Sequence, residues 1–111
     1  MKIAIIGSRS FQDYDLVQAV LSEYSPTQII SGGAKGADSL AERFAAENNI
    51  EKLIFYPDWD LHGRAAGPIR NKLIVDAADF VLAFWDGASR GTKSSIDYAN
   101  KIGKSLRMIK M

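Results

Sequence analysis

Five apolar runs of strand length recur along the chain, and a helical pattern lies between each run and the next. The runs cover residues 3–6, 28–30, 53–56, 80–85 and 106–111. Most of them are continuous rather than alternating, which is typical of parallel strands buried on both faces. Alternating strands and helices favour an open parallel sheet with right-handed crossovers. The sequence therefore predicts an α/β protein.

The segments between the runs carry apolar residues at the spacing of one helix face. The four stripes are Leu16, Val17, Val20 and Leu21; Leu40, Ala41, Phe44 and Ala45; Ile69, Leu73, Ile74 and Ala77; and Ile96, Ala99 and Ile102. Gly103 follows the last stripe and predicts the end of that helix.

Length and composition exclude several classes of protein. With 111 residues, the chain is expected to form one domain over residues 1–111. A net charge of +1 predicts no strong general attraction to nucleic acid or to anionic membranes. The absence of cysteine and the single histidine argue against a metal site, and we expect no cofactor. No run is long enough to cross a bilayer, so a cytoplasmic protein without a membrane partner is expected.

The loops that leave strands for helices differ from those that return. The returns are short and plain, such as Ser25-Pro26 and Asn48-Asn49. Glycines, arginines, carboxylates and hydroxyls gather instead in residues 7–10, 32–38, 58–67 and 86–92. In a parallel sheet these four loops share one edge, where ligands bind. This asymmetry predicts a binding site at the carboxyl edge of the sheet.

The glycine-rich turn at 31–38, Ser-Gly-Gly-Ala-Lys-Gly-Ala-Asp, joins a strand to a helix. Such a turn directs backbone N–H groups and the positive end of a helix dipole at one point, which suits a phosphate. Glycine also serves any tight turn, so one such turn leaves both interpretations open. Ser39 and Glu42 fit a capping box. Asp38 either caps the helix or binds ribose hydroxyls.

The loop over residues 57–67 places two arginines near a helix start. Pro68 is predicted at the first helical position, with Arg64 before the helix and Arg70 in its first turn. Positive charges near a helix N-terminus oppose the helix dipole. An anion bound between the arginines and the helix end would explain their presence. The alternative is that they are exposed and bend toward Asp58 or Asp60. Trp59 either offers a flat surface to a base or packs in the core.

The first and fourth loops carry similar signals. Ser8 and Arg9 suit a phosphate, although alone they also fit a turn with a solvated arginine. Gly91-Thr92 precedes a helix, with Thr92 as donor or N-cap. All four loops together yield the predicted ligand-binding residues: Gly7, Ser8, Arg9, Gly32, Gly33, Ala34, Gly36, Asp38, Asp58, Trp59, Arg64, Gly67, Arg70, Asn71, Trp85, Asp86, Ser89, Arg90, Gly91 and Thr92.

With these motifs, the chain resembles the SLOG superfamily, which joins Smf/DprA domains with LOG-type enzymes, and in particular its YspA/YpsA-related branch. The motifs are residues 7–9, 31–38, 63–71 and 85–92. The resemblance implies a three-layer Rossmann-like domain whose five parallel strands take the order 3-2-1-4-5. It also implies a pocket for a nucleotide or nucleotide derivative over the strand ends, and pairing through helices into a homodimer.

One position departs from the LOG-type pattern. Those enzymes resemble this chain at Gly91-Thr92 but carry a glutamate, used in cleaving an N-glycosidic bond, where this chain has Ser95. Serine cannot supply comparable charge or acid–base chemistry. Either another carboxylate substitutes, or the domain binds without cleaving. The catalytic candidates are Asp58, Asp86 and Asp97, with Arg70 beside them.

Three functions follow from these observations. The first is a binding or sensing module for a phosphorylated nucleoside or an ADP-ribose-like molecule. The second is an N-glycosidic-bond hydrolase acting on nucleoside monophosphates. The third is a DprA-like single-strand nucleic-acid binder, which the near-neutral charge and interspersed aspartates disfavour relative to a small pocket.

Overall fold

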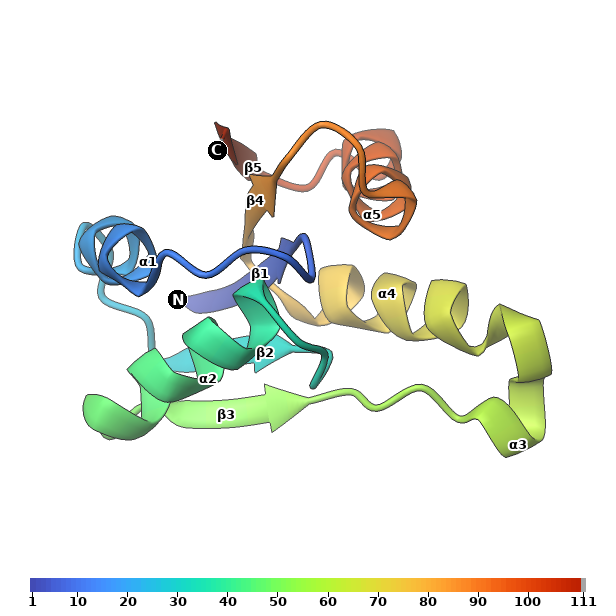
Figure 1. Cartoon of the computed structure of the whole chain (residues 1–111), viewed down its shortest axis with the longest axis horizontal. Coiled ribbons are helices and arrows are strands. Elements are labelled where there is room, and N and C mark those ends of the chain that lie inside the picture. The colour runs from blue at the N-terminus through green and yellow to red at the C-terminus, as the bar shows by residue number, and fades with distance from the viewer. Residues whose placement is uncertain (111) are drawn as a thin grey trace.

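The computed structural model describes residues 1–110, which form one sheet of five parallel strands with helices on both faces (Figure 1). The strand order is β3-β2-β1-β4-β5. The strands are β1 (Lys2–Gly7), β2 (Gln28–Ser31), β3 (Glu51–Ile54), β4 (Phe80–Trp85) and β5 (Leu106–Lys110). The predicted α/β class and strand order are confirmed, while Met111 of the fifth predicted run lies outside the described residues.

The helices divide between the two faces of the sheet. Helices α1 and α2 pack together on one face, and α4 and α5 pack together on the other. The helical segments are α1 (Tyr14–Leu21), α2 (Ala37–Glu47), α3 (Trp59–His62), the 3₁₀ turn η1 (Gly63–Ala65), α4 (Ala66–Ala77) and α5 (Arg90–Lys101). None of these helices is both long and apolar enough to span a membrane.

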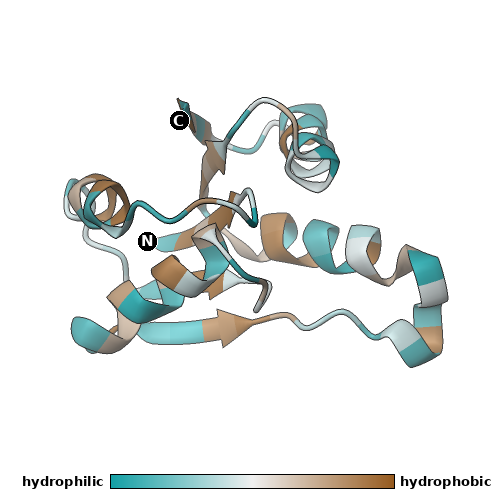
Figure 2. Cartoon of the chain, in the orientation of Figure 1, coloured by the Kyte–Doolittle hydropathy of each residue, from teal (hydrophilic) through white to brown (hydrophobic). Residues whose placement is uncertain are grey.

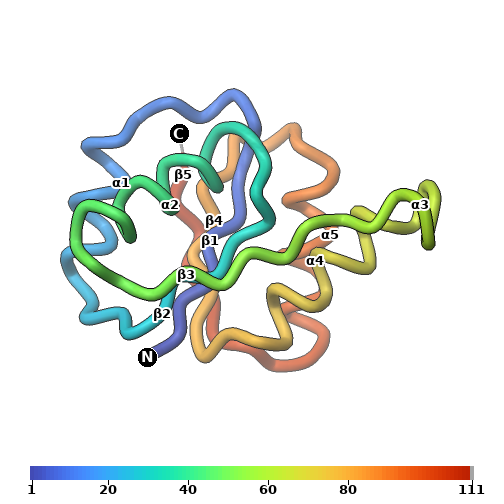
Figure 3. Tube along the Cα trace, turned by 90° about the horizontal axis from the view of Figure 1, so that it is seen from below, coloured from blue at the N-terminus to red at the C-terminus, as the bar shows by residue number. Residues whose placement is uncertain are grey.

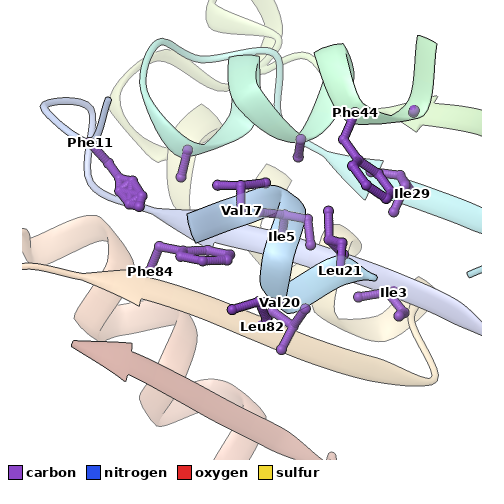
Figure 4. Packing of buried hydrophobic residues seen from close by; sticks show 13 residues of the cluster. Ile3, Ile5, Phe11, Val17, Val20, Leu21, Ile29, Phe44, Leu82 and Phe84 are labelled. Carbon is purple, nitrogen blue, oxygen red and sulfur yellow. The ribbon is translucent and has the colours of Figure 1, made fainter. Parts of the chain in front are cut away.

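The side chains of the central strand β1 enter two hydrophobic cores, one on each face of the sheet. Alternate residues of β1 point to opposite sides, so Ile3 and Ile5 enter the core under α1 and α2 while Ala4 and Ile6 enter the core under α4 and α5. Figure 4 shows the first core, where the rings of Phe11 and Phe84 lie 5.1 Å apart between centroids. The apolar runs of β1 and β4 are therefore covered on both faces, as predicted, whereas the run in edge strand β5 is not, because Arg107 and Met108 are exposed.

The edge strand β3 differs from its prediction. It begins at Glu51 rather than at Leu53, and its first two residues are exposed. Figure 2 shows this strand changing from hydrophilic to hydrophobic along its length. Polar residues are tolerated here because an edge strand has one open side, and Glu51 accepts a hydrogen bond from the Gln28 side chain.

The third loop is more ordered than the sequence analysis expected. Asp58 caps the short helix α3 by accepting a hydrogen bond from Leu61 N–H at 3.0 Å. The segment from β3 through α3 extends away from the body of the molecule (Figure 3). Helix α4 starts at Ala66, so the predicted first helical position of Pro68 is wrong by two residues. The reason is that η1 runs directly into α4.

The predicted helix faces need two further corrections. Leu73 is 47% exposed, because the buried face of α4 is formed by Ala66, Ile74 and Val75 instead. Ile102 lies after α5 and is 44% exposed. Gly103 takes a φ of +73° and donates its N–H to Asn100, and this confirms its predicted role in ending the helix.

Candidate functional site

A cavity of about 360 Å³, called the main cavity below, lies at the carboxyl edge of the sheet. All four strand-to-helix loops or the helices they start contribute to its wall. Its lining residues are Ile6, Gly7, Arg9, Ala34, Asp38, Trp59, Gly67, Pro68, Arg70, Asn71, Ile74, Ser89, Arg90, Gly91, Thr92, Ser94 and Ser95. The loops thus meet at one hollow, as parallel topology requires.

Helix periodicity decides which residues of α4 and α5 reach this cavity. Positions i, i+3, i+4 and i+7 share one helix face. In α4 these positions are Gly67, Arg70, Asn71 and Ile74, all of which line the cavity. Arg64 lies outside this face because it belongs to the preceding 3₁₀ turn.

The amides of the glycine-rich turn bind a carboxylate of the chain itself, that of Asp38. One carboxylate oxygen of Asp38, Oδ2, accepts hydrogen bonds from the N–H groups of Gly32 and Ala34, both at 3.2 Å. The sequence predicts either capping of the helix or binding of ribose hydroxyls for Asp38. The structure shows that it closes the turn and leaves its other oxygen without a partner among residues 1–110.

Ser39 and Glu42 do not form the predicted capping box. Helix α2 begins after Gly36, which precedes Ser39 by three residues. The Ser39 hydroxyl donates to the carbonyl of Ala34, and the Glu42 carboxylate accepts a hydrogen bond from the Ser31 hydroxyl at 2.7 Å. Both side chains therefore brace the turn rather than the helix start.

Burial raises the pKa of Asp38 to about 6. The amides of Ala34 and Gly32 and the charge of Arg70 act in the opposite direction but do not outweigh the loss of hydration. Because the folded-state pKa exceeds the unfolded value of about 3.9, the folded protein holds this proton more tightly than the unfolded chain does. Ionised Asp38 therefore destabilises the fold at neutral pH.

The Asp38→Asn variant is expected to gain stability relative to the wild type as pH rises from 4 to 7. The gain should approach roughly 3 kcal/mol above the folded pKa, because that is the free energy of a shift of about two pH units. Urea unfolding of both proteins at several pH values measures it.

Asp86→Asn is the matched control, because amides of Ala88 and Ser89 lower the pKa of Asp86. It should lose stability relative to the wild type as pH rises. A pH-independent difference between the wild type and Asp38→Asn would contradict this assignment of Asp38.

Arg70 crosses from α4 to the glycine-rich turn. Its guanidinium donates to the carbonyls of Gly32 and Phe55 and to the Asn71 side chain. Burial lowers the pKa of Arg70, Asp38 raises it, and the like charge of Arg9 lowers it again. Arg9 and Arg70 therefore repel each other across the cavity, and neither forms an ion pair within 4.0 Å in the part of the chain that the structure describes.

The N-terminus of α5 forms the opposite wall. Ser89 caps this helix by accepting a hydrogen bond from Thr92 N–H at 3.4 Å, so the predicted capping role of Thr92 belongs to Ser89. The N–H groups of Arg90 and Gly91 donate to no group in residues 1–110. Free amides beside the positive end of a helix dipole attract an anion.

Ser95, at the position of the LOG-type glutamate, lines the same wall. It is buried, and its hydroxyl donates to the carbonyl of Gly91 at 3.1 Å within its own helix. Of the residues that line the main cavity, Asp38 alone carries a carboxylate.

Several predicted ligand-binding residues do not line the main cavity. Gly32 and Gly33 line a neighbouring cavity of about 320 Å³, called the side cavity below. The residues that line neither cavity are Ser8, Gly36, Asp58, Arg64, Trp85 and Asp86. The catalytic candidates Asp58 and Asp86 are thus on neither wall, and exposed Asp97 pairs with Lys93 at 2.9 Å.

Most of these residues have structural partners instead. The Ser8 hydroxyl accepts a hydrogen bond from Asp86 N–H, and the Trp85 indole N–H donates to the carbonyl of Ser89. Gly36 takes a φ of +78° and lies against the backbone of Ser8. These residues shape the loops that carry the site.

Several other lining residues were not among the predicted ligand-binding residues, although some lie within the predicted loops. Pro68 and Ser94 line the main cavity, while Lys35, Tyr56 and Pro57 line the side cavity. Helix periodicity from Gly91 would have identified Ser94 and Ser95. Tyr56 had been assigned to a strand, although it lies beyond the end of β3 and is 70% exposed.

Comparison with known proteins identifies relatives along most of the chain. The profile of the YspA, cpYpsA-related SLOG family matches residues 1–62. The gene 61 protein of Mycobacterium phage D29 is 36% identical over an alignment that covers 92% of this chain and 90% of that protein.

Two solved structures of DNA processing protein A share the fold. The Helicobacter pylori protein, whose structure is described for its single-stranded DNA binding mode, superposes with a TM-score of 0.74 at 23% identity. That match covers 97% of this chain and 64% of the other. The Streptococcus pneumoniae DprA structure matches with a TM-score of 0.80 at 20% identity, covering 96% of this chain and 49% of the other. This chain therefore spans about half to two thirds of those DprA chains.

Proposed function

Because the chain belongs to the YspA, cpYpsA-related SLOG family, we propose that it binds a nucleotide or nucleotide derivative in the main cavity. The ligand is a phosphorylated nucleoside or an ADP-ribose-like molecule, and the protein acts as a binding or sensing module. The observation that carries the proposal is the convergence of Arg9, Arg70 and Arg90 on one cavity that contains a single carboxylate.

The arrangement of these arginines favours a phosphate between them. Arg9 and Arg70 repel each other, and the carboxylate of Asp38 is the one anionic group that lines the cavity with them. A phosphate would accept charge-assisted hydrogen bonds from Arg9 and from Nη2 of Arg70, which donates to no group in residues 1–110, and would replace that repulsion with attraction. The free N–H groups of Arg90 and Gly91 supply further donors at the start of α5.

The remaining walls suit a nucleoside. Trp59 is 55% exposed at the cavity rim and offers a flat ring to a base. The second oxygen of Asp38 accepts from a ribose hydroxyl. The volume of about 360 Å³ falls within the usual range for a small-ligand pocket.

Binding without cleavage is favoured over hydrolysis of an N-glycosidic bond. A hydrolase needs a carboxylate that is free to stabilise or protonate the reacting sugar. Ser95 carries none, and one oxygen of Asp38 already accepts two backbone hydrogen bonds. Incubation with the four nucleoside monophosphates, followed by chromatography, should release no free base; release that depends on Asp38 would establish the hydrolase.

A DprA-like single-strand DNA binder is the second candidate, because the two solved structures described above are DprA structures. That function requires a groove that follows several phosphates and an affinity that falls steeply with salt. The net charge of +1 provides less general attraction to a strand than a basic protein has. An oligothymidylate titration at two salt concentrations distinguishes the two candidates.

The proposed function predicts that a nucleotide stabilises the folded protein. At a free concentration 100-fold above the dissociation constant, the gain in unfolding free energy should be about 2.7 kcal/mol. A thermal-shift series with nucleoside mono- and diphosphates and ADP-ribose measures it, and Arg90→Ala should reduce the shift. If every nucleotide leaves the melting temperature unchanged at millimolar concentration, the proposal fails.

A further inference from the structure

The side cavity adjoins the main cavity, and the two together are called the cleft below. Arg9, Ala34, Trp59 and Arg70 line both of them, so the two arginines lie at the junction. The volumes, about 360 and 320 Å³, are similar. A ligand that fills only the main cavity leaves the second half of this cleft unused.

The side cavity is the more positively charged of the two. Arg9, Lys35 and Arg70 line it, and no carboxylate does. None of these three cations forms an ion pair with another residue between positions 1 and 110. Three unpaired cations around one cavity do not serve folding. They suit the binding of an anionic ligand.

Two exposed aromatic rings line the same side cavity. Tyr56 is 70% exposed and Trp59 is 55% exposed. The Tyr56 ring packs against Gly33, where a Cβ atom would lie 2.6 Å from the ring carbon Cε1. One part of the ring is thus held against the glycine while the rest faces solvent, as a platform for stacking a base would be.

We propose that the cleft binds a ligand with two nucleoside units joined through phosphate. The first unit occupies the main cavity, the linking phosphate lies between Arg9 and Arg70, and the second base stacks on Tyr56 with Lys35 beside it. This inference rests on the proposed function, since it assigns the second half of the same site. Two kinds of molecule share this chemistry: a dinucleotide linked by pyrophosphate and a short piece of single-stranded nucleic acid.

Titration calorimetry of the full chain tests the proposal with three matched sets of probes. These are the four nucleoside 5′-monophosphates, their symmetric P¹,P²-dinucleoside diphosphates, and their 5′-phosphorylated 3′–5′ dinucleotides. A monophosphate and the corresponding dinucleoside diphosphate carry nearly the same charge, so a difference between them reports the second nucleoside. For at least one base, the two-base ligand should bind about tenfold more tightly than the monophosphate, as one stacked base provides.

Substitutions in the side cavity test whether the tighter binding of the two-base ligand arises there. Tyr56→Ala should remove the tenfold preference and leave monophosphate affinity unchanged, while Tyr56→Phe, which keeps the ring, should retain it. Lys35→Gln should weaken the two-base ligand by about threefold, in line with the loss of one exposed charge contact. Lys52→Gln is the control, because this exposed lysine lines neither cavity.

The outcomes separate this inference from the proposed function. Preference for a pyrophosphate-linked or a 3′–5′-linked ligand, if abolished by Tyr56→Ala, supports the inference and identifies the source of the ligand. Equal affinity for monophosphate and two-base ligands overturns the inference and leaves the proposed function standing. A preference unaffected by Tyr56→Ala and Lys35→Gln also overturns it. Failure of every probe to bind overturns the inference, and the thermal-shift series with ADP-ribose then decides whether the proposed function stands.

Discussion

Replacing Arg70 with alanine is expected to weaken nucleotide binding by about a hundredfold. Arg70 lines both cavities and is held toward them by the carbonyls of Gly32 and Phe55. Loss of a pre-positioned, charge-assisted pair of hydrogen bonds to phosphate costs roughly 2–3 kcal/mol, which corresponds to this change in affinity. Titration calorimetry with the tightest-binding nucleotide measures the effect.

Two further variants serve as controls for Arg70→Ala. Arg64→Ala removes an exposed arginine from the preceding turn, which lines neither cavity, and should leave the affinity within twofold of the wild type. Arg70→Lys keeps the charge but loses the planar fork, so an intermediate affinity is expected. Wild-type affinity in folded Arg70→Ala would show that the phosphate does not contact this residue.

Gly36→Ala is expected to be the most destabilising single substitution among those considered, at about 3–5 kcal/mol. Gly36 has φ +78° and ψ −129°, a backbone conformation nearly restricted to glycine that costs an L-residue roughly 1–3 kcal/mol. An added Cβ would also collide with the carbonyl oxygen of Ser8 and the backbone of Arg9. Relief requires a shift of the first loop away from α2, a form of overpacking that costs further stability.

Gly103→Ala is the comparison for a positive φ without a steric collision. Gly103 has a similar φ of +73°, but nothing lies within 4 Å of an added Cβ. It should therefore show the backbone cost alone, about 1–2 kcal/mol in urea unfolding. If both variants lose equal stability, the close approach of the first loop to Gly36 contributes nothing.

The fold was predictable because its signals are local and repeated. The apolar runs of β1 and β4 are buried on both faces, so no polar alternation obscures them. The edge strand β3 was predicted two residues too late, and the short helix α3 was predicted as part of a loop. Glu51 and Lys52 read as loop residues, and the start of α3 depends on one hydrogen bond from Leu61 N–H to Asp58.

The location of the site was predictable, but the contacts within it were not. Parallel topology alone brings Arg9, Asp38, Arg70 and Thr92 to one edge. That Asp38 folds back onto the amides of Gly32 and Ala34 depends on the path of the turn in three dimensions. The phase of α4 likewise selects Arg70 over Arg64, and it follows from the start at Ala66, which the sequence did not mark.

The convergence of four separate loops on one nucleotide is the central claim, and amide chemical-shift mapping tests it most directly. Titration of the ¹⁵N-labelled protein with the tightest-binding nucleotide should shift the amides of Arg9, Ala34, Arg70 and Gly91 together, with one dissociation constant. Amides of α1 and β5, which lie away from the cavity, should not move. Shifts confined to one loop, or spread over α1 and β5, would contradict a shared site.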